Sequence, residues 1–164
     1  MPVYKKYESI LKDKFDLKAK EICLEFLLST GKYKVDTPLE FQKEEFKKRD
    51  FVVLNSKTNK PISIECEVKT VWDKSGEWQN PKWNLHIPYR KKNSKADLFF
   101  IVNNNFDTLC IIKSKTLMSS KVIIKNTINK ITGSKTYGEK FFEIELKKAS
   151  FFYKKKKAWV EIIL

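Results

Sequence analysis

The amino-acid sequence predicts a single α+β domain built on a mixed central β-sheet that is flanked by helices. The chain has 164 residues, the size of one ordinary domain, so residues 1–164 are treated as one unit. Apolar residues make up 41% of it, with only 4 Gly and 5 Pro, which excludes a disordered or collagen-like protein. One long helical pattern comes first, and several β-rich runs follow it.

The first predicted element is a long helix over Tyr4–Ser29, with a break near Asp16 left open. Its apolar residues recur at spacings of three and four. They are Tyr7, Ile10, Leu11, Phe15, Ile22, Cys23, Phe26 and Leu27. Gly31 follows the last of them, which is typical of a helix C-terminus. Tyr33–Val35 is predicted as a short strand, and the polar stretch Thr37–Lys48 is left unassigned.

Two β-hairpins are predicted next. The first joins the β-rich runs Phe51–Leu54 and Ile62–Val71 through the turn-forming residues Asn55–Pro61. The second joins Leu98–Val102 to Thr108–Ile112 through another polar loop. Each hairpin makes its two strands adjacent and antiparallel.

The remaining predicted elements are short strands and one helical turn. The strands are Leu85–Pro88, Val122–Ile124, Phe141–Leu146 and Trp159–Leu164. The helical turn is Lys115–Ser120, and the run Lys154–Lys157 is interpreted as a solvated turn rather than a specific clamp.

Positive charge dominates the composition. Lys and Arg number 34 against 20 for Asp and Glu, a net charge of +14, and this excess indicates an anionic partner, first of all nucleic acid. All but Arg49 and Arg90 are lysines, which favours phosphate binding over the reading of bases. Residues 21–50 hold six basic and seven acidic residues, whereas residues 82–115 and 121–164 carry net charges of +5 and +7.

The cysteine pattern and the apolar pattern point to a cytoplasmic, intracellular protein. Three cysteines is an odd number and none is in a CxxC pair, so a disulfide framework or a zinc site is not expected. No segment reaches the roughly 18 apolar residues of a membrane span, and the charged N-terminus lacks the apolar core of a secretion signal. No membrane partner is therefore expected.

One stretch combines charges in a pattern that suits metal chemistry. Side chains alternate across a strand, so Glu65, Glu67 and Lys69 share one face of the second strand of the first hairpin. If that hairpin forms, Asp50 lies beside Glu67 and Lys69. Two carboxylates with a neighbouring lysine suit a magnesium ion that also binds substrate phosphate oxygens.

Asp50 followed, after a β-hairpin, by Glu67-Val68-Lys69 resembles the motif of the PD-(D/E)xK, or restriction-endonuclease-like, nuclease superfamily. The resemblance covers about residues 18–112 and implies a restriction-endonuclease-like fold. It implies that Asp50 and Glu67 bind the metal, that Val68 offers its backbone carbonyl, and that Lys69 positions or activates the water.

The resemblance also implies a glutamate on the preceding helix, for which Glu21 is the first choice and Glu25 the second. A basic segment after the ExK strand is also common in the family, and here it supplies candidate nucleic-acid contacts. These candidates are His86, Tyr89, Arg90, Lys91 and Lys92. One departure from the family pattern is Arg49, which stands where a proline often precedes the aspartate.

Several of the candidate site residues also have a simpler, structural interpretation. A Glu-x-Glu-x-Lys strand is often only a solvated face, and Glu65 is interpreted as a neighbour rather than a ligand. His86 is the only histidine and has no recognisable nucleophile beside it, so a structural role is its default. The tryptophans are interpreted first as packing residues. The four glycines fit no phosphate-binding loop, which disfavours ATP chemistry.

The function expected from these observations is a Mg²⁺-dependent nuclease, an endonuclease that hydrolyses DNA phosphodiester bonds, with Mn²⁺ as a substitute metal. The alternative is a non-catalytic basic nucleic-acid-binding module. A third interpretation is an assembly protein whose lysines meet an acidic protein. The structure of the DNA substrate, and whether a homodimer cuts both strands, are left open.

Overall fold

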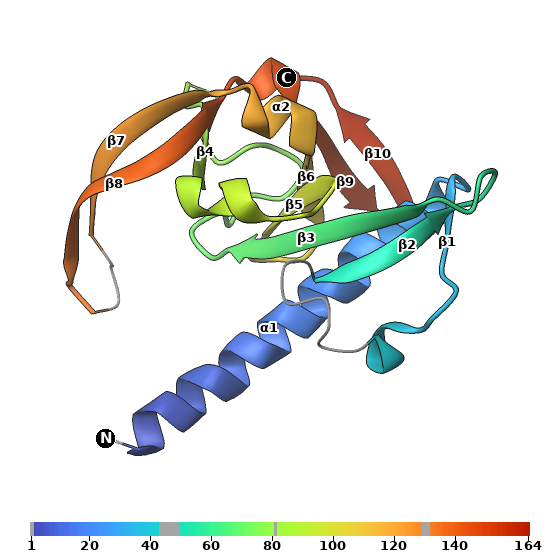
Figure 1. Ribbon diagram of the computed structural model, residues 1–164, viewed down its shortest axis with the longest axis horizontal. Helices are drawn as coiled ribbons and strands as arrows, with labels where there is room; N and C mark the ends of the chain where they lie inside the picture. The colour runs from blue at the N-terminus through green and yellow to red at the C-terminus, as the bar shows by residue number, and fades with distance from the viewer. Residues whose placement is uncertain (1, 43–49, 81, 129–131) are drawn as a thin grey trace.

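The elements follow the chain as one long helix and then a series of strands (Figure 1). The computed structural model describes residues 2–42, 50–80, 82–128 and 132–164, and in the first helix it describes side chains from Phe15 onward. Residues 43–49, which end the unassigned polar stretch and include Arg49, lie outside the described residues. The helices, 3-10 helices and strands are α1 Pro2–Ser29, β1 Tyr33–Lys34, η1 Leu39–Phe41, β2 Phe51–Asn55, β3 Pro61–Lys69, β4 Leu85–Pro88, η3 Tyr89–Asn93, β5 Leu98–Asn103, β6 Thr108–Lys113, α2 Ser114–Met118, β7 Lys121–Ile128, β8 Lys135–Ile144, η4 Leu146–Lys148, β9 Ser150–Lys155 and β10 Ala158–Ile162.

Seven of the described strands form one mixed sheet in the order β1-β2-β3-β5-β6-β9-β10. β3 and β5 are parallel, and the other neighbours are antiparallel. Both predicted hairpins are present, since β2 pairs with β3 and β5 pairs with β6. The chain is thus a single small α+β domain in which strands predominate, and the predicted mixed sheet is confirmed.

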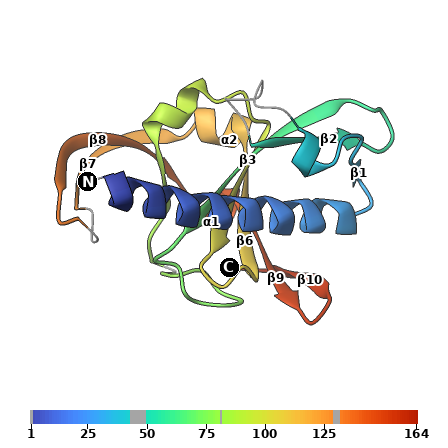
Figure 2. The ribbon, with the colours of Figure 1, turned by 90° about the horizontal axis from the view of Figure 1, so that it is seen from below.

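α1 covers one face of this sheet (Figure 2). Among the α1 side chains described from Phe15 onward, the buried ones are adjacent or spaced three or four residues apart, which places them on one side of the helix. They are Ala19, Cys23, Phe26 and Leu27. They pack against apolar side chains of β2, β3 and β5, among them Phe51, Ile64 and Phe100. The three cysteines are free, and the neighbouring Cys23 together with burial raises the pKa of the Cys66 thiol.

α1 runs through Asp16 without interruption, so the break left open there does not occur. Beyond Pro2 the helix contains neither proline nor glycine, and nothing in its sequence would interrupt the backbone hydrogen bonds. Gly31 has φ +69°, the left-handed conformation that ends many helices. No helix in the described parts of the chain, α1 included, is long and apolar enough to cross a membrane.

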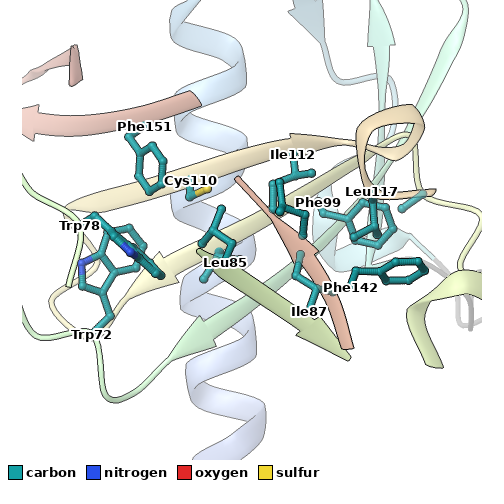
Figure 3. Packing of buried hydrophobic residues seen from close by; sticks show 13 residues of the cluster. Trp72, Trp78, Leu85, Ile87, Phe99, Cys110, Ile112, Leu117, Phe142 and Phe151 are labelled. Carbon is teal, nitrogen blue, oxygen red and sulfur yellow. The ribbon is translucent and has the colours of Figure 1, made fainter. Parts of the chain in front are cut away.

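The sequence predicts a sheet flanked by helices, and α1 covers one face, but the opposite face is covered mainly by strands and loops. A three-stranded antiparallel sheet, β4-β8-β7, lies there with the short helix α2. Figure 3 shows Ile87 of β4, Phe142 of β8 and Leu117 of α2 packed near Phe99 of β5. The β-branched residues of β7, among them Val122, Ile123 and Ile124, favour a strand, as the sequence predicts for Val122–Ile124.

The C-terminal strands differ in extent from the prediction. β7 extends beyond Val122–Ile124 at both ends, β8 begins at Lys135 and ends at Ile144 rather than Leu146, and β10 ends at Ile162 rather than Leu164. β9 was not predicted. The lysine run is only partly a turn, because β9 continues through Lys155 while it pairs with β10. Lys156, with φ +59°, lies in the tight turn between the two strands. Pairing with neighbouring strands here outweighs the low strand propensity of lysine.

Candidate active site

The β2–β3 hairpin fixes Asp50 beside the middle of β3. Phe51 pairs with Ile64, and the backbone N–H of Asp50 donates to the carbonyl of Ile64 at 2.8 Å. The Oδ2 atom of Asp50 then accepts a hydrogen bond from the backbone N–H of Cys66 at 2.7 Å. This contact holds the carboxylate next to the residue that precedes Glu67, as the predicted hairpin requires.

Glu67 and Lys69 project from β3 on the face opposite α1. In the parallel ladder with β5, Glu67 lies beside Ile101 and Lys69 beside Asn103. Ile101 belongs to the apolar cluster on that face, together with Trp78. The Nζ atom of Lys69 is 5.0 Å from the centroid of a Trp78 ring, a cation–π contact that orients the side chain.

Glu67 and Lys69 both have perturbed acid–base properties. Burial raises the pKa of the Glu67 carboxyl, and the charge of Asp50 adds to this, while Arg90 and Lys69 oppose it. Burial lowers the pKa of Lys69, and the charge of Lys125 adds to this, while Glu67 opposes it. Opposite shifts in adjacent groups of one half-buried cluster are typical of functional sites, although structural ion pairs also produce them.

The raised pKa of Glu67 has a consequence for stability. We expect Glu67→Gln to increase the free energy of unfolding at pH 7 when a chelator is present. A raised folded-state pKa means that the protonated form adds stability below the ordinary pKa of 4.5, and that this stability is lost as the pH rises through the folded-state pKa. Glutamine removes the cost of the buried charge at neutral pH.

Urea unfolding at pH 4 and pH 7 measures this effect. The stability gain of Glu67→Gln should be larger at pH 7 than at pH 4. The matched control is Glu161→Gln, which changes an exposed carboxylate on β10. A gain that is equal at both pH values, or equal in the control, would contradict the assignment of an unfavourable buried charge to Glu67.

The backbone carbonyl of Val68 points to the edge of β3 at which Asp50 accepts a hydrogen bond from Cys66. Backbone groups of alternate strand residues point to the same neighbouring strand. Ile64 and Cys66 direct theirs toward β2 and Asp50, so the carbonyl of Val68 lies on this side as well. The carbonyl that the resemblance assigns to the metal thus lies at the same edge as Asp50.

Glu65 is already occupied by protein contacts. Its carboxylate accepts from the Lys91 ammonium and from the Ser94 hydroxyl. Together with Glu67 and Lys91 it borders a space of about 10 Å³, room for about one water molecule. The interpretation of Glu65 as a neighbour rather than a ligand agrees with these contacts.

The structure does not bring a helix glutamate to Asp50 and Glu67. α1 packs on the face formed by Ile64, Cys66 and Val68, whereas Glu67 points to the other face. Glu21 is exposed on α1, and Glu25 forms an ion pair with Lys154 at 2.6 Å. Within residues 2–42, 50–80, 82–128 and 132–164, no group of three or more His, Cys, Asp or Glu residues is placed to hold a metal ion.

His86 has two hydrogen-bonding partners. Its Nε2 atom is 3.1 Å from Oε2 of Glu143, and its Nδ1 atom is 2.9 Å from Nζ of Lys125. A neutral ring that donates from Nε2 and accepts at Nδ1 satisfies both contacts. His86 therefore links β4 to β8 and β7, which agrees with the structural role taken as its default.

The three basic side chains of the segment differ in their exposure. Lys91 is half-buried against Glu65, whereas Arg90 and Lys92 are exposed. Arg90 lies 3.8 Å from Glu139, and Lys92 is 4.6 Å from the centroid of the Tyr89 ring. Tyr89 itself packs against Phe142, with ring centroids 5.0 Å apart. Arg90 and Lys92 are thus the members of this segment best placed to meet phosphates.

Sequence reasoning missed the contribution of β7 and β8. Lys125 contacts His86 and perturbs Lys69, and Glu143 and Glu139 pair with His86 and Arg90. No local spacing connects these residues to the hairpin motif. Only the antiparallel packing of β8 on β4 brings them there.

Comparison of the chain with known proteins finds no matching family model, no similar curated protein and no similar solved structure. The chemical argument therefore depends on the residues and on their geometry.

Proposed function

We propose that the chain is a Mg²⁺-dependent nuclease that hydrolyses DNA phosphodiester bonds, cutting within the strand. The observation that carries the proposal is that the β2–β3 hairpin holds Asp50 beside β3, where its charge acts on Glu67, whose strand face also carries Lys69. We further propose that α1, this hairpin and β5 form a restriction-endonuclease-like core of the PD-(D/E)xK type.

The donor set fits a hard cation. Oδ2 of Asp50 is held by a backbone N–H, so its other oxygen can bind a metal. Glu67 makes no hydrogen bond or ion pair within the described part of the chain, and its charge is disfavoured by burial and by Asp50. A divalent cation between two such carboxylates would relieve both effects, with the Val68 carbonyl as a further oxygen.

Each residue then has a defined part in hydrolysis. Asp50, Glu67 and the Val68 carbonyl would hold Mg²⁺ or Mn²⁺, which would supply electrostatic stabilisation of the scissile phosphate and lower the pKa of water. Lys69 holds the attacking water in line and offsets the negative charge that develops on the phosphate. Trp78 limits the positions that the Lys69 ammonium can take.

The alternative is a basic nucleic-acid-binding module without chemistry. It is favoured by the net charge of +14 and by the finding that, within the described residues, no group of three or more His, Cys, Asp or Glu residues is placed to hold a metal ion. Both functions involve binding to nucleic acid, but only the nuclease requires the carboxylates of Asp50 and Glu67.

Incubation of the purified protein with supercoiled plasmid, linear duplex and branched DNA, with Mg²⁺, Mn²⁺ or chelator, tests the proposal. We expect nicking or cutting in Mg²⁺ or Mn²⁺ and intact DNA in chelator. Retained DNA binding without cleavage of any substrate would select the non-catalytic module. Cleavage in the presence of chelator would exclude the metal-dependent mechanism.

Phosphate contacts by the basic segment give a further prediction. Replacing Arg90 and Lys92 together by alanine should lower the slope of log affinity against log salt by up to about two units, because each phosphate contact on duplex DNA contributes about 0.9. Sequence preference should not change. Fluorescence anisotropy in chelator at several salt concentrations measures the slope.

Lys91→Ala is the matched comparison and should behave differently. It leaves the half-buried Glu65 carboxylate without its ammonium partner, which costs about 1–3 kcal/mol of stability. Its effect on the salt slope should be smaller than that of the double variant. A double variant with the parental slope would remove Arg90 and Lys92 from the DNA-binding surface.

A further inference from the structure

β7 and β8 form a two-stranded ribbon that extends beyond the body of the protein. The strands pair from Lys121 with Glu143 to Ile128 with Lys135, and only Phe141–Ile144 of β8 also pairs with β4. Figures 1 and 2 show the outer part of the ribbon leaving the body on the side where the N-terminal end of α1 also lies. The tip, residues 129–131, is outside the described residues and is not used below.

The outer ribbon exposes large apolar side chains. Ile124, Ile128 and Tyr137 have exposed fractions of 67%, 62% and 71%. A lone two-stranded ribbon is marginally stable in water, and a group of exposed apolar side chains generally marks a binding surface. The exposed apolar side chains therefore indicate that the ribbon contacts a partner.

The charge of the ribbon indicates an anionic partner. Its described lysines, Lys121, Lys125, Lys135 and Lys140, are all exposed. Its two acidic residues are both engaged by protein groups: Glu139 accepts from Thr127 at 2.8 Å and lies 3.8 Å from Arg90, and Glu143 lies 3.1 Å from His86. Lys125 contacts His86 and the Nζ atom of Lys140 lies 6.0 Å from the centroid of the Tyr89 ring, yet both side chains remain exposed, as do Lys121 and Lys135.

The base of the ribbon adjoins the candidate active site. Lys125 contacts His86 of β4, and Arg90 of η3 pairs with Glu139 of β8. Ile87 of β4, which pairs with Phe142 of β8, borders the same small space as Glu67. In Figure 1 the carboxyl end of β3, which carries Lys69, points toward the side from which the ribbon extends. A polymer held by the ribbon can thus continue to Asp50, Glu67 and Lys69.

The ribbon also bends. The register of β7 and β8 shifts between Lys125 and Thr127, and the side chain of Asn126 accepts from the backbone N–H of Gly138 at 3.0 Å. Such a bulge increases the twist of a ribbon. A twisted two-stranded ribbon fits the major groove of B-form DNA, which is about 12 Å wide, whereas the major groove of duplex RNA is too narrow for side chains to read.

We propose that the β7–β8 ribbon is a DNA-binding arm that enters the major groove of a duplex and holds that duplex against the Asp50–Glu67–Lys69 site. This inference rests on the proposed nuclease function and adds its substrate class, B-form double-stranded DNA. Lys135 and Lys140 bind phosphates, and Ile124, Ile128 and Tyr137 supply apolar contact in the groove.

The test compares two double variants of equal charge change. Lys135→Gln with Lys140→Gln alters the ribbon, and Lys57→Gln with Lys113→Gln alters exposed lysines of the β2–β3 turn and of β6. Binding is measured by fluorescence anisotropy in chelator, with a DNA duplex, an RNA duplex of the same sequence and single-stranded DNA. The ribbon variant should lower the salt slope on duplex DNA by about two units, and the control should leave it nearly unchanged. The wild type should bind duplex DNA more tightly than the other two.

The outcomes separate this inference from the proposed function. Equal salt slopes on duplex DNA for the two double variants would reject the assignment of the ribbon as a DNA-binding arm. Equal affinity of the wild type for the DNA and RNA duplexes would reject it as well. Loss of self-association in the ribbon variant, measured by sedimentation with an unchanged DNA slope, would assign the ribbon to contacts between copies instead. If the salt slope falls as expected in the ribbon variant but the wild type cuts no DNA, the ribbon is a DNA-binding arm and the proposed nuclease function is wrong.

Discussion

Glu67→Gln and Asp50→Asn should each reduce DNA cleavage by on the order of a thousandfold or more, at or beyond the loss caused by removing one preorganised electrostatic group. Each change removes a charged oxygen donor on which the proposed cation depends. The isosteric amides preserve the local packing, and asparagine at position 50 retains an acceptor for the Cys66 N–H. Cleavage rates in Mg²⁺ and duplex affinity in chelator are the two readouts.

Duplex affinity in these variants should stay close to that of the wild type or increase, because a carboxylate near a phosphate is repulsive. Glu21→Gln is the matched control, since this exposed glutamate on α1 lies apart from the pair. It should cut at the parental rate. Full activity in both Glu67→Gln and Asp50→Asn would show that the site is wrongly assigned.

Lys69→Met should lower the single-turnover rate by on the order of a hundredfold or more, the scale expected when one preorganised electrostatic group is lost. Methionine keeps much of the length of the side chain and its apolar contact with Trp78 but removes the ammonium. Because Lys69 is assigned to the water and to developing charge, the metal affinity of the protein should change little. Rapid mixing of excess protein with labelled duplex gives the rate of the chemical step.

Lys113→Met provides the comparison for Lys69, since it removes an exposed lysine at the end of β6. Its single-turnover rate should equal that of the wild type. If Lys69→Met also cuts at the parental rate, Lys69 is an ordinary lysine of the strand face. If both variants lose activity together, the effect reflects overall charge rather than the position of one ammonium.

The hairpin that carries the candidate site could be predicted because its signals are local. Apolar runs on both sides of Asn55–Pro61 define two strands, and the alternation along β3 places Glu67 and Lys69 on one face. The pairing found between β2 and β3 then brings Asp50 to Cys66. Local pattern and tertiary pairing agree here, so sequence reasoning succeeds.

The remaining features depend on contacts between distant segments. Which face α1 covers decides whether Glu21 can approach Glu67, and the alternation of β3 alone does not specify that face. The ion pair of Lys91 with Glu65, and the contact of Lys125 with His86, connect residues 26 and 39 positions apart. In a chain with 34 lysines and arginines, no spacing distinguishes these lysines from solvated ones.

The extended β7–β8 ribbon was missed for a different reason. Its outer residues mix lysines and other polar residues with the exposed Ile124, Ile128 and Tyr137 and do not face the core, so they lack the alternation by which half-buried strands are recognised. Their strand conformation is stabilised by pairing with one another. Sequence patterns that reflect burial therefore find only the inner part of each strand.

Titration of Mn²⁺ into the protein, followed by the electron paramagnetic resonance signal of the free ion, tests the central claim most directly. That claim is that Asp50 and Glu67 together hold one divalent cation. The wild type should bind Mn²⁺ at a site that Mg²⁺ competes for, and Asp50→Asn and Glu67→Gln should each weaken it strongly, while Glu21→Gln binds as the wild type does. Mn²⁺ binding that is absent in the wild type, or unchanged in both variants, would contradict the account.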